Sequence, residues 1–596
     1  MAVLNFKGKT FVQNHHLAVK YHQLVPQKDK SLTDKVSLND NLIIHGDNLK
    51  ALKALLPTYA GKIKCIYIDP PYNTGNENWV YNDNVNSPMM QEWLGKVVDK
   101  EDFTRHDKWL CIMMPRLKLL RELLREDGVI FISIDDHEVS HLTMLMDEIF
   151  QEHNYVATLV WQKNSGGGND SSHIAVSHEY ILCYAKNIEN PQFRILNVPP
   201  TESMLKAYNL EDEYVTTRGK YTLRNLNDFS IGDRPGLHHD IECPDSTFLD
   251  GEEHRWRCDE NTFKRRLQEN RIVFLKNDDD EWDVFWKLYI NEQKGELIID
   301  EDGTILSLGK KPNTLLYKLA FTGDGKKDLM KIFGSSPFSY PKPTKLIKCL
   351  LSIACKKNDI VLDSFAGSGT TGQAVLELNG HDGGNRKFIL IQMPEAIKQK
   401  VYISKKTGEE VDKPKKGETT SKVVEKPFAL EDGTKLREII DIIEYRLKKL
   451  TQSGNSITNT NETQKNSLKG TFSYFELGDP IEMESILEGD KLPDYLELAR
   501  YVFYTATGEE FDPEKVDEKR NFIGESKDYE VYLFYKPDIE YLRTTALNLD
   551  KAKNLGESKN KKRLVFAPSK YLDHDFLLEY RIDYCQLPFE IYKLKG

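Results

Sequence analysis

The chain has 596 residues, a length that predicts roughly three domains, each burying its own apolar core. Its composition, 39% hydrophobic and 29% charged, is that of a globular protein. No run approaches the roughly 18 apolar residues of a bilayer span and the N-terminus has no apolar signal core, which predicts a cytoplasmic protein without membrane contact. The net charge of −11 argues against a polyanion partner, but only the local charge of a groove decides this.

The eight cysteines form no CxxC pair and no Cys/His spacing typical of a zinc site. We therefore expect buried, reduced thiols and no bound metal. The histidine pairs, His15 with His16 and His238 with His239, have no ligand-like context and are expected at the surface.

The first part of the chain alternates strands and helices. Apolar runs predict strands at residues 41–47, 64–72 and 128–135. Apolar residues at helical spacing predict helices at 48–56, 107–127 and 136–149. Strand, helix and strand in succession predict a parallel sheet. A strand pair follows at 155–161 and 179–185, with a Gly-rich loop at 165–170 between them.

The pattern changes between residues 187 and 335, where strands are short and Arg and Lys interleave with aromatic residues. This change predicts an inserted domain. The α/β pattern then resumes with a helix at 344–355, a strand at 359–365, a helix through Leu378 and a strand at 387–393. We therefore expect the first domain at 41–186, interrupted by the insertion and completed at 336–451.

The remainder divides into a loop, a helix and a C-terminal piece. Residues 404–433 are rich in Lys, Glu, Thr and Gly and predict a solvated, charged loop. A helix from Leu436 to Leu450 and a polar linker at 452–467 follow. Because the sheet is expected to be complete by Met393, residues 468–596 are predicted to form a separate α+β domain, and residues 1–40 an N-terminal extension.

A Gly-rich turn, DSFAGSGTT at residues 363–371, follows a predicted strand and opens a helix. In this context backbone cradles a nucleotide or nucleoside, and Gly367 and Gly369 allow the backbone to approach the ligand. The turn lacks the spacing of a dinucleotide site and the ending of a P-loop. A different phosphate ligand and a plain tight turn remain alternatives.

A second motif, DPPYNTGN at residues 69–76, lies at the carboxyl end of a predicted strand, where open α/β sheets bind ligands. Pro70 and Pro71 fix the backbone and lack N–H donors, so the Pro70 carbonyl and the Asp69 carboxylate can both accept from one amine. The Tyr72 ring can stack on a flat base. An ordinary strand-ending turn is the plain alternative, and the presence of both motifs at strand ends argues against it.

These motifs and their order resemble the β class of amino-methyltransferases that modify DNA, in which DPPY precedes FAGSGTT. Within that class, the chain most resembles the modification (Mod) subunits of Type III restriction-modification systems. The resemblance covers most of residues 41–393 through HGDNLKAL, DPPYNTGN, MMPRL, GVIFISIDD, SHEYILCYAKN, YPKP and FAGSGTT. It implies a Rossmann-like, mixed sheet of seven strands, interrupted by a target-recognition domain at 187–335.

The resemblance also implies S-adenosylmethionine as the cofactor. The implied cofactor-binding residues are Asp47, Asn48, Lys342, Asp363, Phe365, Gly367, Ser368, Gly369, Thr370 and Gln392. Among them, Lys342 would approach the cofactor carboxylate. Many methyltransferases carry a carboxylate for the cofactor ribose where this chain has Gln392, and Glu395 is the candidate replacement.

The reaction expected from these motifs is methyl transfer to the exocyclic amine of an adenine flipped out of double-stranded DNA. Asp69 and the Pro70 carbonyl would accept the amine hydrogens and localise the lone pair on nitrogen, and alignment would favour in-line displacement. In the inserted domain, the candidates for DNA contacts are Arg218, Lys220, Tyr221, Arg224 and Arg234. A solvated polar face is the alternative for them.

Several alternatives stay open. Cytosine enzymes usually carry SPPY and protein glutamine enzymes NPPY, so Asp69 favours adenine. The resemblance implies a homodimer held largely by residues after Lys469, through the aromatic segments 471–478 and 499–508, and a restriction (helicase-nuclease) subunit docked on it. A solitary methyltransferase would lack that partner. A non-catalytic DNA-binding subunit is disfavoured by the two intact motifs.

Overall fold

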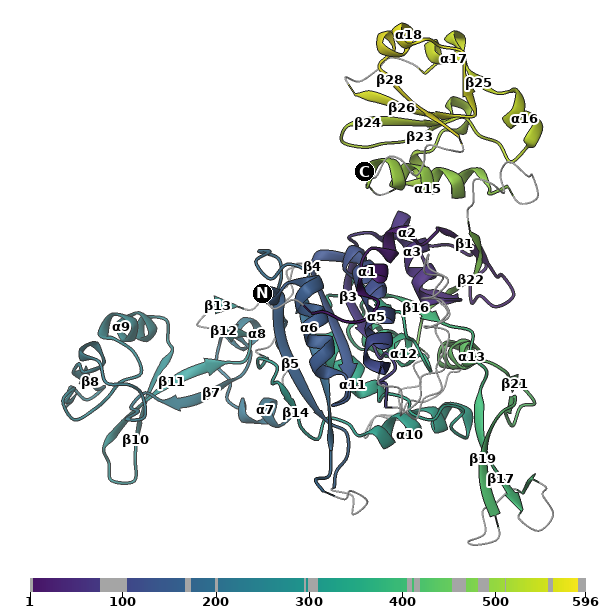
Figure 1. The fold of residues 1–596 in the computed structure, drawn as a ribbon. Coiled ribbons are helices and arrows are strands. Elements are labelled where there is room, and N and C mark those ends of the chain that lie inside the picture. The colour runs from purple at the N-terminus through teal and green to yellow at the C-terminus, as the bar shows by residue number, and fades with distance from the viewer. Residues whose placement is uncertain are drawn as a thin grey trace. The chain divides into compact units, whose positions relative to one another are not determined.

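The computed structural model describes residues 4–74, 104–166, 173–198, 202–293, 296–297, 309–404, 410–411, 419–452, 468–480, 492–509, 511–555 and 561–587. The chain divides into two compact units (Figure 1). Unit 1 contains Met1–Ile195 and Asn313–Gly596, and unit 2 contains Leu196–Pro312. Unit 2 is therefore shorter than the inserted domain predicted at 187–335.

Unit 1 is built on a mixed sheet with ten described strands. In spatial order they are β1 (His22–Pro26), β22 (Ser473–Pro480), β2 (Leu42–His45), β16 (Lys387–Gln392), β15 (Ile360–Asp363), β3 (Ile63–Ile68), β4 (Leu124–Ile134), β6 (His178–Ala185), β5 (Tyr155–Gln162) and β14 (Leu315–Leu316). The strands from β2 to β4 run parallel, and β6 pairs antiparallel with both β4 and β5. The strand order reverses between β15 and β3, because β3 leads to β4 on one side and β15 leads to β16 on the other. Open α/β sheets bind ligands at such a switch point.

Helices cover both faces of this sheet, which explains why its central strands are continuous apolar runs. The helices around the sheet are α1 (Lys9–Val12), α2 (His15–Ala18), α3 (Asn48–Tyr59), α5 (Arg105–Leu123), α6 (Val139–Phe150), α10 (Thr322–Phe333), α11 (Thr344–Ala354), α12 (Thr370–Asp382) and α13 (Ile439–Gln452). Helices α3, α5 and α6 share one apolar core with alternate strand residues such as Ile66, Ile68 and Ile132. Helices α11, α12 and α13 pack on one another outside that core, on the other face.

Seven of the ten strands are the expected ones, but β1, β14 and β22 were not predicted. The expectation that the sheet is complete by Met393 is wrong, because β22 pairs in parallel with β2. The segment 471–478, predicted for a separate C-terminal domain, therefore belongs to the main sheet, where Tyr474 and Phe475 are buried. The physical reason is the edge of β2, an apolar strand that would otherwise leave its backbone hydrogen-bonding groups unpaired.

The C-terminal part combines a helix with a four-stranded sheet. Its elements are α15 (Tyr495–Thr507), β23 (Phe522–Glu525), β24 (Tyr529–Leu533), α16 (Ile539–Thr544), β25 (Ala546–Leu547), α17 (Leu549–Lys553), β26 (Lys562–Ala567), β27 (Ser569–Lys570), α18 (His574–Glu579) and β28 (Ile582–Gln586). The aromatic segment 499–508 lies on α15, and Tyr501 packs on Tyr21 with ring centres 4.7 Å apart. This apolar segment is thus buried within the chain, so its composition gives no argument for a subunit interface.

The charged loop predicted at 404–433 is a second correction. The described residues there form a β-ribbon of β17 (Lys398–Ser404), β18 (Glu410–Val411) and β19 (Thr419–Glu425), followed by the pair β20 (Phe428–Ala429) and β21 (Lys435–Leu436). Strand β19 is solvated, as expected, with Val423 62% exposed, whereas Val401 on β17 is buried. Composition alone suggested a loop, but cross-strand backbone hydrogen bonds order the ribbon without a core of its own.

Unit 2 has a small core of its own. Its strands and helices are α7 (Glu202–Ala207), α8 (Val215–Arg218), β7 (Tyr221–Asn225), β8 (Ile241–Glu242), β9 (Phe248–Leu249), α9 (Glu260–Gln268), β10 (Ile272–Lys276), β11 (Trp282–Tyr289), β12 (Glu292–Gln293) and β13 (Glu296–Leu297). The strands β10, β11 and β7 form an antiparallel sheet. Trp256, Phe263 and Val284 are buried at the centre of this unit.

The remaining expectations concern cysteines and histidines. All eight cysteines are free, seven are buried, and Cys349 is half-buried, as expected for reduced thiols. The surface position predicted for His15 and His16 is wrong, because α2 packs on α5 and leaves them only 7% and 8% exposed. Among the helices that the structure describes, none has the length and apolar character needed to cross a bilayer.

Candidate active site

The two sequence motifs meet at the carboxyl edge of the sheet. Asp69 follows β3 and Asp363 ends β15, and these strands are parallel neighbours that pair through Cys65 with Val361. The charge of Asp69 contributes to the raised pKa of Asp363, which places the two carboxyl groups in the same electrostatic environment. The switch point of the sheet therefore carries both groups of predicted site residues.

The Asp69 carboxylate lies at the centre of a buried polar cluster. Its Oδ1 is 2.9 Å from the ammonium of Lys342 and accepts a 2.9 Å hydrogen bond from the Tyr72 hydroxyl. The second carboxylate of the cluster belongs to Glu179 on β6, whose Oε2 lies 3.3 Å from the same ammonium and 3.1 Å from the same hydroxyl. The ammonium also donates to the Tyr72 oxygen at 2.7 Å. Two carboxylates thus share two donors.

The charges in this cluster are unequal. Burial raises the pKa of Asp69, and Lys342 only partly offsets that rise. Burial also favours the neutral form of Glu179, but Lys342 and Lys163 outweigh it and lower the pKa of Glu179. Burial opposes the charge of Lys342 as well, yet the two carboxylates raise its pKa. Glu179 is consequently the more firmly ionised carboxylate, and Lys342 remains a cation.

Sequence reasoning found Asp69 and Tyr72 but missed Glu179, and it assigned Lys342 to the cofactor. The structure brings the Lys342 ammonium to Asp69, because the segment before α11 passes beside the end of β3. The backbone carbonyl of Lys342 accepts a hydrogen bond from the Thr370 hydroxyl at 3.2 Å, so Lys342 contacts both the DPPY motif and the Gly-rich turn. The HEY triplet of the segment SHEYILCYAKN was a signal for Glu179, because a carboxylate at the start of a buried strand needs a partner.

Residues of α5 and of the start of α6 hold the loop after β3 at Pro71 and Asn73, on either side of Tyr72. The Trp109 indole donates to the Pro71 carbonyl at 2.7 Å. The Asn73 amide donates to Glu138, and Asn73 is fully buried with a φ of 58°. The left-handed backbone conformation is unfavourable for most residues with a side chain. The hydrogen bond to Glu138 helps to hold Asn73 in it.

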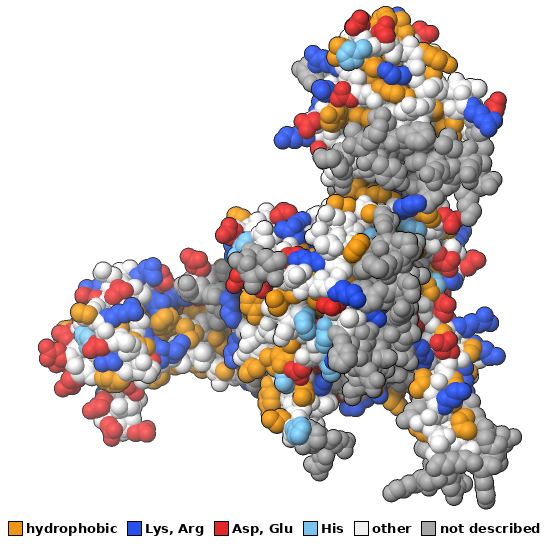
Figure 2. Space-filling model, in the orientation of Figure 1, with side chains coloured by type: hydrophobic (Ala, Val, Ile, Leu, Met, Phe, Trp, Pro, Cys, Tyr) orange, Lys and Arg blue, Asp and Glu red, His pale blue; other side chains and the backbone are white. Residues whose placement is uncertain are grey.

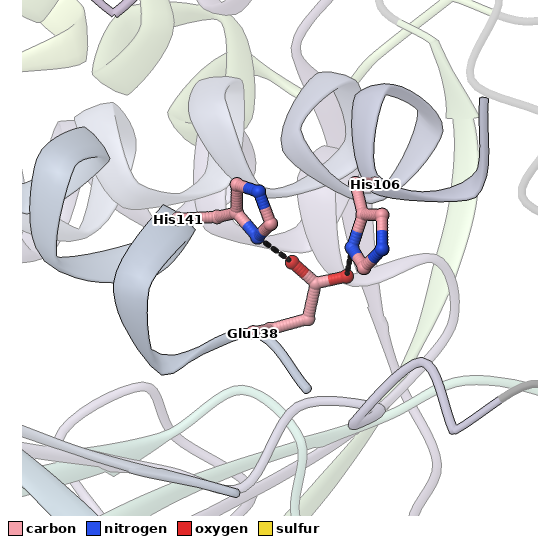
Figure 3. Close-up of side chains that lie close together, drawn as sticks. All are labelled: His106, Glu138 and His141. Atoms are coloured by element: carbon pink, nitrogen blue, oxygen red, sulfur yellow. Dashed lines mark hydrogen bonds and ion pairs between the residues drawn. The ribbon is translucent and has the colours of Figure 1, made fainter. Parts of the chain in front are cut away.

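Glu138 lies between His106, with which it shares a hydrogen bond, and His141, with which it forms an ion pair (Figure 3). Its Oε1 lies 2.6 Å from Nδ1 of His106, and its Oε2 lies 3.0 Å from Nδ1 of His141. The three ligand atoms lie within 4.8 Å of one another, as in a metal site. Arg105 donates to Nε2 of His106 at 3.3 Å, however, which leaves the ring proton on Nδ1, facing Glu138. The contacts therefore indicate a hydrogen-bonded support for Asn73.

The Gly-rich turn owes its glycines to backbone conformation. Gly367 and Gly369 have φ values of 53° and 78°, a region that residues with a side chain rarely adopt. A Cβ at Gly369 would also approach Ile443 to 3.0 Å, whereas one at Gly367 would make ordinary contact with Phe338. The Gly367 N–H donates to Oε1 of Gln392 at 2.8 Å. Gln392 thus braces the turn.

Two buried polar groups lie at the base of this turn. Asp363 is 2% exposed and accepts hydrogen bonds from the Thr371 hydroxyl at 2.6 Å and the Phe365 N–H at 3.0 Å. Burial raises its pKa to about 7. Ser364 is buried too, and its hydroxyl finds no hydrogen-bond partner among the described residues. A buried hydroxyl of this kind is available to a polar ligand.

Arg446 on α13 fastens the same turn. Its guanidinium is fully buried and donates to the Ser368 carbonyl at 2.9 Å and to the Thr370 hydroxyl at 3.1 Å. Burial lowers its pKa to about 10. This residue was missed, although its position on the apolar face of the predicted helix, between Ile443 and Leu447, was a signal.

The other expected cofactor contacts are engaged within the fold. The Asp47 carboxylate caps α3 by accepting from the Lys50 N–H at 3.0 Å. Asn48 is fully buried, where its side chain accepts from Arg116 at 2.7 Å and donates to the Ser364 carbonyl at 3.1 Å. The phenyl ring of Phe365 is partly buried against the main core. These residues lie around the strand ends, as expected, but their side chains brace the site.

Two of the five DNA-contact candidates in unit 2 pack within that unit. The Arg218 guanidinium stacks 3.9 Å from the ring centre of Tyr214 and pairs with Glu292 at 3.4 Å. Tyr221 is half-buried against Tyr289, with ring centres 5.4 Å apart. Both side chains therefore contribute to the structure of unit 2.

The other three candidates have exposed side chains. Lys220 pairs with Glu211 at 2.7 Å, and both are 54% exposed. Arg224 on β7 and Arg234 in a loop are also exposed. Acidic and basic side chains both lie on the face of unit 2 seen in Figure 2. Lys220, Arg224 and Arg234 are therefore the accessible candidates.

Comparison with known proteins places this site in a family. The family model described as DNA methylase matches residues 63–406, which is more than half of the chain. This chain belongs to the DNA methylase family.

Its curated relatives include Mod subunits and a Type II enzyme. It is 32% identical over 418 residues to the Type III restriction-modification enzyme StyLTI Mod subunit of Salmonella typhimurium, covering 68% of this chain and 60% of the relative. It is 35% identical over 422 residues to the EcoPI Mod subunit of Escherichia phage P1, covering 66% and 64%. It is 32% identical over 403 residues to the Type II methyltransferase M.KpnI of Klebsiella pneumoniae, covering 64% and 86%. The chain thus matches less than two thirds of the length of these two Mod subunits.

Proposed function

We propose that this chain transfers a methyl group from S-adenosylmethionine to the exocyclic amine of an adenine in double-stranded DNA. One observation carries the proposal: the Asp69 carboxylate and the Gly-rich turn lie at the carboxyl ends of adjacent parallel strands, at the switch point of the sheet. Membership of the DNA methylase family supports it.

The residues at the turn fit such a cofactor. The free hydroxyl of buried Ser364 and the left-handed backbone at Gly367 and Gly369 leave polar groups available beside the end of β15. Asp363, Phe365 and Ser364 would hold the cofactor there. When bound, S-adenosylmethionine supplies a methyl group on a positively charged sulfur.

The residues of this chain must activate the adenine amine, which is a weak nucleophile. The lone pair of the adenine amine is delocalised into the ring, and Asp69 localises it by accepting an amine hydrogen. The Pro70 carbonyl is the second acceptor. Tyr72 remains a neutral phenol, because burial and the two nearby carboxylates raise its pKa well above the ordinary value. A base must leave the duplex to reach these groups.

We further propose that unit 2 contributes to DNA binding through Arg224 and Arg234, whose exposed guanidinium groups suit phosphates or base edges. The likeness to Mod subunits supports the proposal that this chain is the modification subunit of a Type III system. In such a system it would form a homodimer that associates with a restriction subunit. A solitary enzyme is the alternative. Light scattering of the full chain tests the dimer, and a monomer at micromolar concentration would exclude it.

One assay tests the reaction and the base together. The full chain is incubated with radiolabelled S-adenosylmethionine and double-stranded DNA, and the digested nucleosides are separated. We expect label in N6-methyladenine. Label in N4-methylcytosine would instead identify a cytosine methyltransferase. If DNA that contains many different sequences stays unlabelled, methyl transfer to DNA is refuted.

A further inference from the structure

Both donors that occupy Asp69 can also reach Glu179. The Lys342 ammonium lies 2.9 Å from Asp69 Oδ1 and 3.3 Å from Glu179 Oε2. The Tyr72 hydroxyl lies 2.9 Å from the first oxygen and 3.1 Å from the second. The oxygen that must accept a hydrogen from the target amine therefore already accepts from two donors. For each donor, the distance to Glu179 exceeds the distance to Asp69 by only a few tenths of an ångström.

We propose that Lys342 lies where the target amine must bind and that Glu179 is the positioning residue that takes over Lys342 and the Tyr72 hydroxyl when the target base enters. This inference rests on the proposed function. The exchange is a shift of hydrogen bonds, in which no covalent bond forms or breaks. It deepens the proposed role of the site by stating how Asp69 becomes free for an amine.

The surroundings favour an exchange over a fixed ion pair. Lys342 is 13% exposed and Glu179 is 12% exposed, so water would solvate neither charge well if its partner moved away. A buried cation needs a carboxylate partner throughout, and Glu179 provides it. Lys163, 3.4 Å from the other oxygen of Glu179, stabilises the ionised form of that carboxylate. Lys342 also lies 4.8 Å from the centre of the Tyr72 ring, which keeps its ammonium close to the ring in either position.

The occupant that displaces Lys342 is a neutral amine on a flat base. It donates one hydrogen to Asp69 and the other to the Pro70 carbonyl without adding a charge, so the net charge of the site does not change when it binds. A hydroxyl substituent has one hydrogen and a carbonyl has none, so neither can satisfy both Asp69 and the Pro70 carbonyl. The exchange thus adds a reason for selecting an exocyclic amine.

Rescue by a double mutant tests the proposal in the full chain. Glu179→Gln keeps the shape and an acceptor for Tyr72 but leaves Lys342 with Asp69 as its one carboxylate among the described residues. We expect kcat/KM for DNA to fall about 30-fold, the equivalent of one charge-assisted hydrogen bond. Adding Lys342→Met should restore part of that loss, because the competitor for Asp69 is gone.

The controls separate this exchange from a structural role. Glu189→Gln, at an exposed loop position, should retain wild-type kcat/KM. Lys342→Met alone should lower KM for DNA, since the amine position is vacant, while kcat falls with the loss of the cation beside Asp69. Cofactor affinity from calorimetry and melting temperatures identify any variant that fails to fold.

Two results would overturn the inference. Glu179→Gln with wild-type kcat/KM would show that Lys342 needs no second acceptor, and a double variant no faster than Glu179→Gln would show that the two residues do not compete for Asp69. A wild-type chain that methylates no adenine would instead refute the proposed function itself.

Discussion

Asp363→Asn tests the cost of burying a carboxyl group beneath the Gly-rich turn. The Asp363 side chain is 2% exposed, and its two hydrogen-bond donors, the Thr371 hydroxyl and the Phe365 N–H, only partly compensate for the water it loses. Burial raises its pKa from 3.8 to about 7. Asparagine mimics the neutral acid in shape and charge, so the substitution isolates the effect of ionisation.

The direction of the effect follows from the two pKa values. The folded state binds the proton more tightly than the unfolded state, so the stability that protonated Asp363 contributes is fully present below about pH 4 and is lost as the pH rises through about 7. The difference between the two values corresponds to roughly 4 kcal/mol when the loss is complete. The asparagine variant lacks this loss.

Urea unfolding at pH 5 and pH 8, followed by tryptophan fluorescence without cofactor, measures the prediction. The unfolding free energy of the wild type should fall between the two pH values by about 3 kcal/mol more than that of Asp363→Asn, because part of the full loss has already occurred below pH 5. Asp575→Asn, at an exposed position, is the matched control and should behave like the wild type. An identical pH dependence in wild type and Asp363→Asn would show that ionisation of Asp363 does not destabilise the fold.

Three further substitutions address the rest of the site. Asp69→Ala should reduce methyl incorporation to background and leave cofactor affinity within about threefold, because the carboxylate acts on the target amine; full activity would contradict its role. Arg446→Met should weaken cofactor binding about tenfold in calorimetry, since the turn loses donors worth about 1 kcal/mol or more. Arg446→Lys should recover part of the lost affinity. Unchanged affinity in the methionine variant would show that Arg446 does not support the turn. Glu138→Gln should lower kcat about tenfold with little change in cofactor affinity, because it weakens the hold on Asn73 and so on the loop that carries Tyr72; an equal loss in both quantities would indicate general unfolding.

The positions of the two site motifs along the chain could be predicted from the amino-acid sequence. Continuous apolar runs specify buried strands, and the motifs that begin at Asp69 and Asp363 each end such a run, so their place at the carboxyl edge of a parallel sheet followed from local pattern. The main helices and the strand pair β5 and β6 were predictable for the same reason. Periodicity is a local property, and it survives in any tertiary context that buries one face.

The contacts between residues from distant segments could not be predicted in this way. Lys342 and Glu179 reach Asp69 from distant segments, and Arg446 reaches the Gly-rich turn from a helix beyond the β-ribbon. Strand β22 closes the edge of β2 although a long polar stretch precedes it in the chain. None of these contacts corresponds to a characteristic spacing of residues in the sequence. Strand order and helix packing bring the segments together, and the need to bury apolar surface and to pair buried charges fixes that arrangement.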